Sequence, residues 1–111
     1  MSFKKSILQA GEGETQLTLK ELTPVRLLKN EFYNQVQNAY GKAASTEELA
    51  VLLGRGRAKR GIFEGDLIEG ELEIGQVSAM IHDIVPAAEI VERMMVECKA
   101  TFSRLGKIIF E

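Results

Sequence analysis

The sequence predicts a small, mainly helical domain of about five helices. Apolar residues recur at helical spacing in most segments, and only one short stretch alternates polar and apolar residues as a strand does. Strands and helices do not alternate along the chain, which argues against an α/β domain within these residues. The 111 residues suit one domain, with a helix and an extended lead-in segment over 1–23 and a helical cap over 24–111.

The first half of the chain predicts two helices and one extended segment. A short helix is expected over Phe3–Ala10, ended by the glycines of "GEGE", and "TQLTL" then alternates in the manner of a strand. Pro24 is expected to open the second helix, because proline is well tolerated in a first turn, and Gly41 is expected to end it. The apolar residues at helical spacing in this second helix are Leu28, Phe32, Val36 and Ala39.

The second half predicts helices with clearer end signals. Ser45 can cap a helix, Glu48 completes a capping box, and Gly54 ends it. "RGRAKRGIFEGD" predicts a short helical turn between glycines, and residues 70–84 predict a helix with a broad apolar face. Pro86 is expected to open the longest helix, whose stripe consists of Ile90, Met94, Cys98, Phe102 and Leu105, widened by Val91 and Met95.

Composition narrows the class of protein. The net charge of −2 argues against a dedicated nucleic-acid binder, and no apolar run approaches the length of about 20 residues that spans a bilayer. The first 14 residues do not read as a signal peptide. One cysteine, Cys98, cannot form an internal disulfide and fits a reducing compartment. We therefore expect a cytoplasmic protein with no membrane or nucleic-acid partner.

The stretch "GDLIEGELEIGQ", from Gly65 to Gln76, has glycines five residues apart where a helix would lose stability from each one. Gly70 at a helix start would offer free amide N–H groups to an anion, and Gly75 would let a ring or a backbone approach closely. The structural alternative is favoured on the residues alone: a turn at Gly65, a helix start at Gly70 and a helix–helix contact at Gly75. Neighbouring Glu71 and Glu73 would repel a phosphate at this place.

No catalytic or metal site is predicted from the residues. The basic run "RGRAKR" could hold an RNA backbone, but it has no aromatic residue for stacking, so a solvated turn or ion pairs with nearby acids are favoured. His82 has no second histidine or cysteine pair with which to bind a metal, and it is expected near the end of the 70–84 helix. Cys98 falls on a predicted core stripe, which disfavours a nucleophile–base pair with His82.

Several of the predicted apolar faces are wide, and about five modest helices are not expected to cover them all. An uncovered apolar face of this kind indicates a partner surface.

The stretch "EGDLIEGELEIGQVSAMIHDIVPAAEIVERMM" resembles the C-terminal segment of the FMN-dependent nitronate monooxygenases (2-nitropropane dioxygenases) and the related enoyl-acyl-carrier-protein reductase II enzymes. "PVRLLKNEF" resembles another stretch of these enzymes through Arg26, Lys29 and Asn30. The resemblance covers nearly the whole chain. Its matching positions in the first stretch are Gly65, Asp66, Gly70, Gly75 and Gln76, followed by Pro86, Ala87, Ala88, Glu89 and Ile90.

The resemblance implies that the chain lies next to a barrel domain and that part of it lies near a flavin. Complete enzymes of this family are TIM-like (β/α)8 barrels with an added helical segment, and FMN lies at the C-terminal ends of the strands. It implies that Gly70, Gly75 and Gln76 lie close to the flavin, the glycines permitting the approach. Glu71, Glu73 and Ile74 stand where the family has serine, methionine and alanine, so these side chains are not included in the predicted contact.

A barrel needs about 250 residues, so the resemblance implies that this chain is the helical C-terminal part without its catalytic barrel. We expect a fragment, a split protein or an isolated domain that binds no FMN alone, caps or braces the flavin barrel, and pairs with that barrel or with its own copy in a homo-oligomer. Two alternatives stay open: the tail of an enoyl-acyl-carrier-protein reductase II, and a stand-alone, non-catalytic helical protein for interaction or dimerisation.

Overall fold

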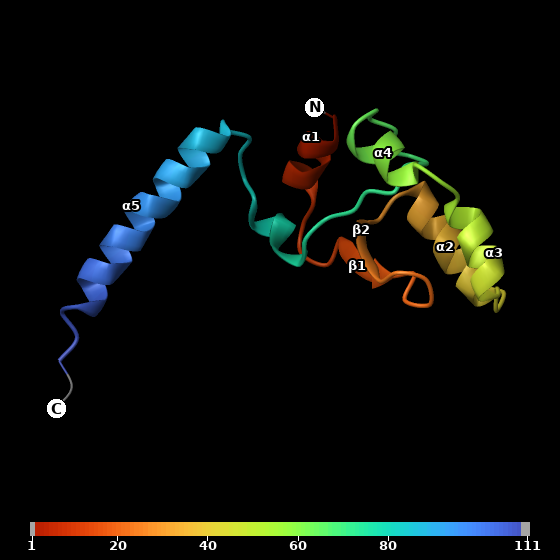
Figure 1. The fold of residues 1–111 in the computed structure, drawn as a ribbon, viewed down its shortest axis with the longest axis horizontal. Helices are drawn as coiled ribbons and strands as arrows, with labels where there is room; N and C mark the ends of the chain where they lie inside the picture. Colours follow the sequence, from red (N-terminus) through yellow and green to blue (C-terminus); the bar gives the residue numbers. More distant parts are fainter. Residues whose placement is uncertain (1, 110–111) are drawn as a thin grey trace.

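The computed structural model describes residues 2–109 and is mainly helical, as the sequence predicts (Figure 1). A two-stranded antiparallel sheet and a short 3-10 helix complete the described part of the chain. In chain order the elements are α1 (Ser2–Gln9), β1 (Thr15–Thr18), β2 (Val25–Leu28), α2 (Glu31–Gly41), α3 (Thr46–Leu53), α4 (Arg57–Ile62), η1 (Gln76–Met80) and α5 (Ala87–Leu105).

Local end signals correctly predicted several of these elements. The Ser45 hydroxyl accepts from the Glu48 N–H at 3.2 Å, and the Glu48 carboxylate accepts from the Ser45 N–H at 2.8 Å, which is the expected capping box of α3. Gly54 ends α3 with a φ of 65°, a left-handed conformation that favours glycine. Pro86 precedes α5, as predicted, and "TQLTL" contains β1.

The predicted helix start at Pro24 is wrong, because residues 25–28 form strand β2 instead. β2 pairs antiparallel with β1, with Leu17 opposite Arg26. The helix begins only at Glu31, where the Asn30 side chain accepts a hydrogen bond from the Tyr33 N–H at 3.0 Å. The reason lies in tertiary contacts, because β1 and residues 72–74 supply backbone hydrogen-bond partners to β2. The spacing of apolar residues along residues 25–28 carries no information about these partners.

The predicted helix over residues 70–84 is also wrong. Residues 72–74 lie beside β2, where the Leu28 N–H donates to the Leu72 carbonyl and the Ile74 N–H donates to the Arg26 carbonyl, both at 3.0 Å. Only η1 is helical in this range, and His82 lies in the extended segment after it. Glycines at 70 and 75 weaken a helix here, and β2 satisfies the backbone groups that a helix would otherwise pair.

Strand β2 joins two apolar clusters because successive side chains of a strand point to opposite faces. Leu27 is fully buried in the main cluster, and Leu28 lies in a smaller cluster with Ala10 and Leu72. The buried residues of the main cluster come from the β1–β2 hairpin and from α2 and α3: Leu19, Leu27, Phe32, Val36 and Leu49. β2 therefore fixes α1 and residues 71–74 on one side and the α2–α3 pair on the other.

Helix α5 extends away from the rest of the molecule (Figure 1), and none of its residues, all of which the structure describes, is buried. The prediction that Cys98 belongs to a core stripe is therefore wrong, since its side chain is exposed. The radius of gyration is 18.9 Å, against about 13 Å for a compact chain of this length. The accessible surface is 8275 Å², about 2,200 Å² more than expected for a compact monomer of this mass.

Among residues 2–109, no helix combines the length and the apolar character that crossing a bilayer requires.

Candidate functional site

The glycine-spaced stretch, residues 65–76, forms a loop that we call the glycine loop. Gly65 opens it with a φ of 83°, a conformation that glycine adopts without strain, and the turn itself lies just after the predicted position, at residues 67–69. The Asp66 carboxylate accepts from the backbone N–H of Glu69 at 2.9 Å and of Ile68 at 3.3 Å, and it pairs with Arg60. The Glu69 N–H and the Arg60 guanidinium lower the pKa of Asp66. The first half of the glycine loop is therefore a locally stabilised turn.

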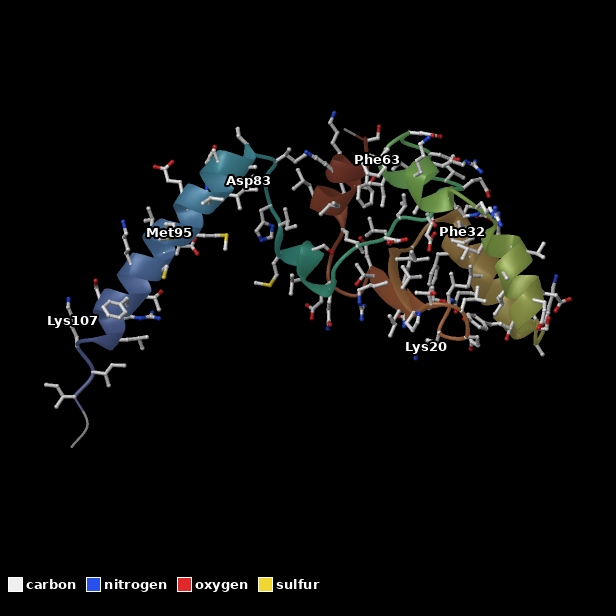
Figure 2. All side chains as sticks on the ribbon, viewed as in Figure 1. Lys20, Phe32, Phe63, Asp83, Met95 and Lys107 are labelled. Carbon is white, nitrogen blue, oxygen red and sulfur yellow. The ribbon has the colours of Figure 1, made fainter. Side chains whose placement is uncertain are left out.

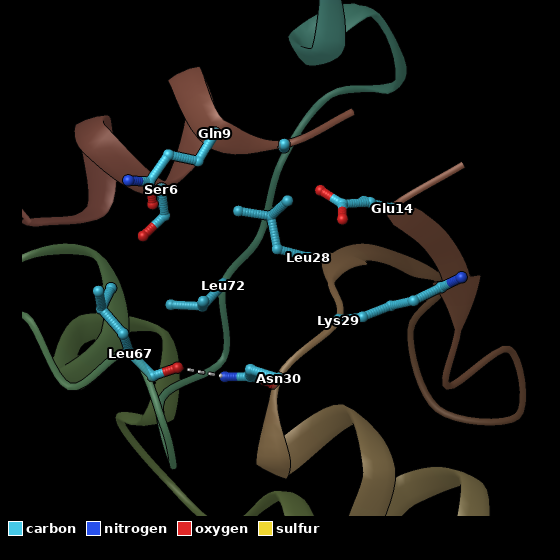
Figure 3. A pocket seen from close by; sticks show the side chains of 9 residues that line it. Ser6, Gln9, Glu14, Leu28, Lys29, Asn30, Leu67 and Leu72 are labelled. Carbon is cyan, nitrogen blue, oxygen red and sulfur yellow. Dashed lines mark hydrogen bonds between the residues drawn. The ribbon is translucent and has the colours of Figure 1, made fainter. Parts of the chain in front are cut away.

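Asn30 anchors the middle of the glycine loop to the start of α2. Its side-chain Nδ2 donates to the Gly70 carbonyl at 2.8 Å. It also donates to the Leu67 carbonyl at 3.1 Å, the bond drawn in Figure 3. Its Oδ1 accepts from the Tyr33 N–H as the helix cap. The nitrogen and the oxygen of the Asn30 amide are therefore both hydrogen-bonded, and together they fix the glycine loop against the first turn of α2.

Arg57, at the first position of α4, is the second anchor. Its guanidinium donates to the carbonyls of Leu52, Leu53 and Glu69 at 2.7–2.9 Å. It also lies 4.4 Å above the centroid of the Phe32 ring, within the range of a cation–π interaction. Arg57 therefore connects the end of α3, the glycine loop and the core ring of α2.

The interpretation of "RGRAKR" as ion pairs with nearby acids is confirmed. Arg57 pairs with Glu69 at 3.5 Å, and Lys59 pairs with Glu64 at 3.5 Å. Arg60 pairs with the Asp66 of the turn. Arg57, Lys59 and Arg60 thus each form an ion pair with a carboxylate of the same chain, as expected for a structural role.

Gly70 lies against Gly61 of α4, and both glycines are buried. A Cβ added at Gly70 would overlap the backbone of Gly61 and the Asp66 carbonyl. A Cβ added at Gly61 would lie 2.9 Å from the Glu71 carbonyl and 2.7 Å from the Leu72 side chain. Within this chain, the close approach that Gly70 permits is therefore to another glycine. Its expected role as a helix start is wrong, since η1 begins only at Gln76.

Gly75 and Gln76 lie together on the surface where the glycine loop leaves the body. Both are exposed, and no atom of residues 2–109 comes within 4 Å of a Cβ added at Gly75, so the expected helix–helix contact at Gly75 is wrong. The Ser78 hydroxyl donates to the Gly75 carbonyl at 2.7 Å and fixes the turn into η1. Of the three predicted contact residues, Gly75 and Gln76 are therefore exposed and Gly70 is buried. Their contact with a cofactor stays a prediction.

The charges near the glycine loop do not suit a phosphate. Glu71 is buried to 8% exposure, and this burial, together with the neighbouring charge of Glu73, raises the pKa of its carboxyl. Arg57 opposes the shift but already donates to three carbonyls. The described residues of the glycine loop therefore do not fit the phosphate of FMN.

A shallow cleft of about 320 Å³ opens between α1, the end of β2 and the glycine loop (Figure 3). Its volume is near the lower end of the range for small-molecule pockets, about 300–1,000 Å³. Its polar lining includes Glu14, Lys29 and Asn30, and Asn30 is already engaged as an anchor. No group of three metal-ligating side chains occurs among residues 2–109.

Neither Asn30 nor Arg57 is predicted from the sequence to be an anchor. A signal for Asn30 was available, since an asparagine directly before a helical stretch is a preferred N-cap. Arg57 gave no local signal, because its carbonyl partners at 52, 53 and 69 are brought together only by the fold.

No family model matches the chain, and no curated protein matches it. Solved structures do. The chain is similar to FabK from Thermotoga maritima, with 31% identity and a TM-score of 0.77, over 96% of this chain and 34% of that one. A structure of a point mutant of the same protein matches with 28% identity and a TM-score of 0.72, over 96% and 30% of the two chains. The chain therefore spans about a third of the length of the structures it matches, and nearly all of it is similar to that third.

Proposed function

We propose that this chain is the C-terminal helical part of an FMN-dependent oxidoreductase resembling nitronate monooxygenase, and that it caps or braces a catalytic barrel. The observation that carries this proposal is the coverage: 96% of the chain is similar to a third of FabK, an FMN-dependent enoyl-acyl-carrier-protein reductase II of this family. A single cytoplasmic domain, with the barrel as its partner and FMN bound outside the chain, is part of the same proposal.

The proposed role of the glycine loop follows from its anchors. Asn30 and Arg57 hold its first half against the body, and Gly61 packs on Gly70 beneath it. Gly75 and Gln76 then face outward with an open side and a free amide side chain, which could contact a group held by the barrel. FMN would supply the redox chemistry there, and these residues would exclude water and fix its orientation.

Enoyl-acyl-carrier-protein reductase II is a second candidate activity, and the observation in its favour is that both matching structures are of FabK. The third candidate, a stand-alone interaction protein, is supported by the exposure of α5. Because the nitronate and enoyl activities differ in the barrel, the first two candidates share the same role for this chain.

A chimaera tests the proposal. The matching third of Thermotoga maritima FabK is replaced by this chain, and the purified protein is assayed for bound FMN by its visible absorbance and for turnover of a nitronate and of an enoyl thioester. We expect close to one FMN per chain. Gln76→Ala in the chimaera should weaken FMN about five-fold, the loss of roughly one hydrogen bond, whereas Gln16→Ala on β1 should leave the affinity unchanged.

The reference proteins are intact FabK and FabK lacking the matching third. A folded chimaera that retains no FMN would contradict the proposal. Equal effects of the Gln76 and Gln16 substitutions would contradict the role of the glycine loop while leaving the cap itself in place.

A further inference from the structure

Glu71 is a buried acidic residue for which the proposed cap has no role. Only 8% of its surface is exposed, and this chain alone produces the burial. Its backbone N–H donates to the Arg57 carbonyl of α4 at 3.1 Å, and the next residue, Leu72, is buried against Leu28 of β2. Residue 71 is therefore held from both sides, and its side chain cannot move into bulk water without breaking a contact of the backbone.

The neighbouring charge of Glu73 favours the neutral form of Glu71. Side chains alternate along an extended segment, so residues 71 and 73 point to the same side, opposite to that of Leu72. A bridge sets Glu73 opposite Leu27, so β2 presents an apolar side chain at this place. Burial and the charge of Glu73 both raise the pKa of the Glu71 carboxyl.

Arg57 is the cation that acts on Glu71 from α4, and its donors are already engaged. Its guanidinium donates to three backbone carbonyls and lies over the ring of Phe32, within the body of the chain (Figure 2). It lowers the pKa of Glu71 less than burial raises it. Among residues 2–109 the Glu71 carboxyl has no hydrogen-bond donor, so a charge on it has no direct partner there.

We propose that Glu71 is a pH-sensitive switch of the glycine loop. With a protonated carboxyl, residue 71 stays packed against α4, and with an ionised carboxyl, the loop opens at this residue toward water. Gly75 and Gln76 follow only four and five residues later, so the switch sets how firmly they are held. It acts within this chain and needs neither FMN nor a barrel, and the inference therefore goes beyond the proposed function.

The direction of the pH dependence follows from the raised pKa of Glu71. A carboxyl whose pKa in the folded chain lies above its ordinary value of 4.5 binds its proton more tightly when folded. The stability of the closed loop is therefore fully present below pH 4.5 and is lost as the pH rises through the folded pKa. Asp66, Glu21 and Glu47 have lowered pKa values, so their contributions are lost only in stronger acid.

Amide hydrogen exchange of the full 111-residue chain tests the switch. The protection of the Glu71 amide, corrected for the intrinsic pH dependence of exchange, should fall about ten-fold between about pH 5 and about pH 8, because a charge without a hydrogen bond is costly to bury. In Glu71→Gln the fall should be less than about two-fold, since no charge forms. The Leu49 amide, bonded to the Ser45 carbonyl in α3, is the internal reference and should keep its protection in both chains.

Thermal unfolding gives a second measurement. Glu71→Gln should raise the midpoint by about 4 °C at about pH 8 and leave it nearly unchanged at about pH 5. Glu73→Gln removes the neighbouring charge and should weaken the pH dependence without abolishing it. Glu92→Gln, which removes an exposed charge of α5, should leave it as it is in the original chain.

Two results would overturn the proposal. One is protection of the Glu71 amide that stays constant, or increases, as the pH rises in the original chain. The other is a Glu71→Gln chain that loses as much protection with pH as the original chain, because the titrating group would then lie elsewhere.

Discussion

Gly70→Ala should lower the free energy of unfolding by about 3 kcal/mol, the upper part of the range for overpacking. The added Cβ would overlap the backbone of Gly61 and the Asp66 carbonyl, and backbone cannot rotate away as the end of a side chain can. The Gly70 carbonyl is also fixed by Asn30 at 2.8 Å, so a shift of the loop would weaken an anchor as well. Urea unfolding followed by circular dichroism measures the effect.

Gly75→Ala is the matched control, five residues along the same loop. No described atom lies within 4 Å of the added Cβ, and Gly75 has a φ of −79° that alanine adopts without strain. Its effect should stay within about 0.5 kcal/mol. Equal losses at the two positions would mean that the Gly61–Gly70 contact does not hold the loop.

Arg57→Ala should cost about 3 kcal/mol, as much as the change at Gly70, because three partly buried carbonyls would lose a charged donor. The side chain of Arg57 retains only 17% of its surface and lies over the Phe32 ring, so packing is lost as well. Arg57→Lys should recover less than half of the loss, since one ammonium cannot reproduce the planar fork that reaches Leu52, Leu53 and Glu69.

Arg55→Ala is the control for a general effect of removing an arginine from this basic run. Arg55 is exposed, so this change should stay within about 0.5 kcal/mol. The same urea unfolding measures all three variants. If Arg57→Lys proved as stable as the original chain, the geometry of the guanidinium hydrogen bonds would have no part in the fold.

Segments whose hydrogen-bond partners are close in the sequence can be predicted from it, and segments whose partners are distant cannot. The capping box of Ser45 and Glu48 and the start of α5 after Pro86 rest on neighbours in the sequence, and both were predicted correctly. The apolar spacing of residues 25–28 and 70–84 predicts helices there. Residues 25–28 instead pair with β1 and with residues 72–74, and short apolar runs do not distinguish a strand from a helix.

In the candidate site too, features set by neighbours in the sequence are predicted, and features set by distant partners are not. The ion pairs of the basic run and the turn that follows Gly65 are local, and the sequence predicts a turn within two residues of the observed one. The contact of Gly70 with Gly61 depends on how the loop folds back onto α4, and no local end signal indicates it. The resemblance identified the right stretch of chain, but it could not show that Gly75 and Gln76 reach the surface while Gly70 is buried.

The most direct test of the account is a titration of the full 111-residue chain, without a barrel, with FMN, followed by quenching of flavin fluorescence. We predict no saturable binding at micromolar concentrations, because Glu71 and Glu73 within the glycine loop would repel the phosphate and because the proposal places FMN on the barrel. One-to-one, tight binding by the chain alone would mean that these residues hold the cofactor without a larger body, and the account would be wrong.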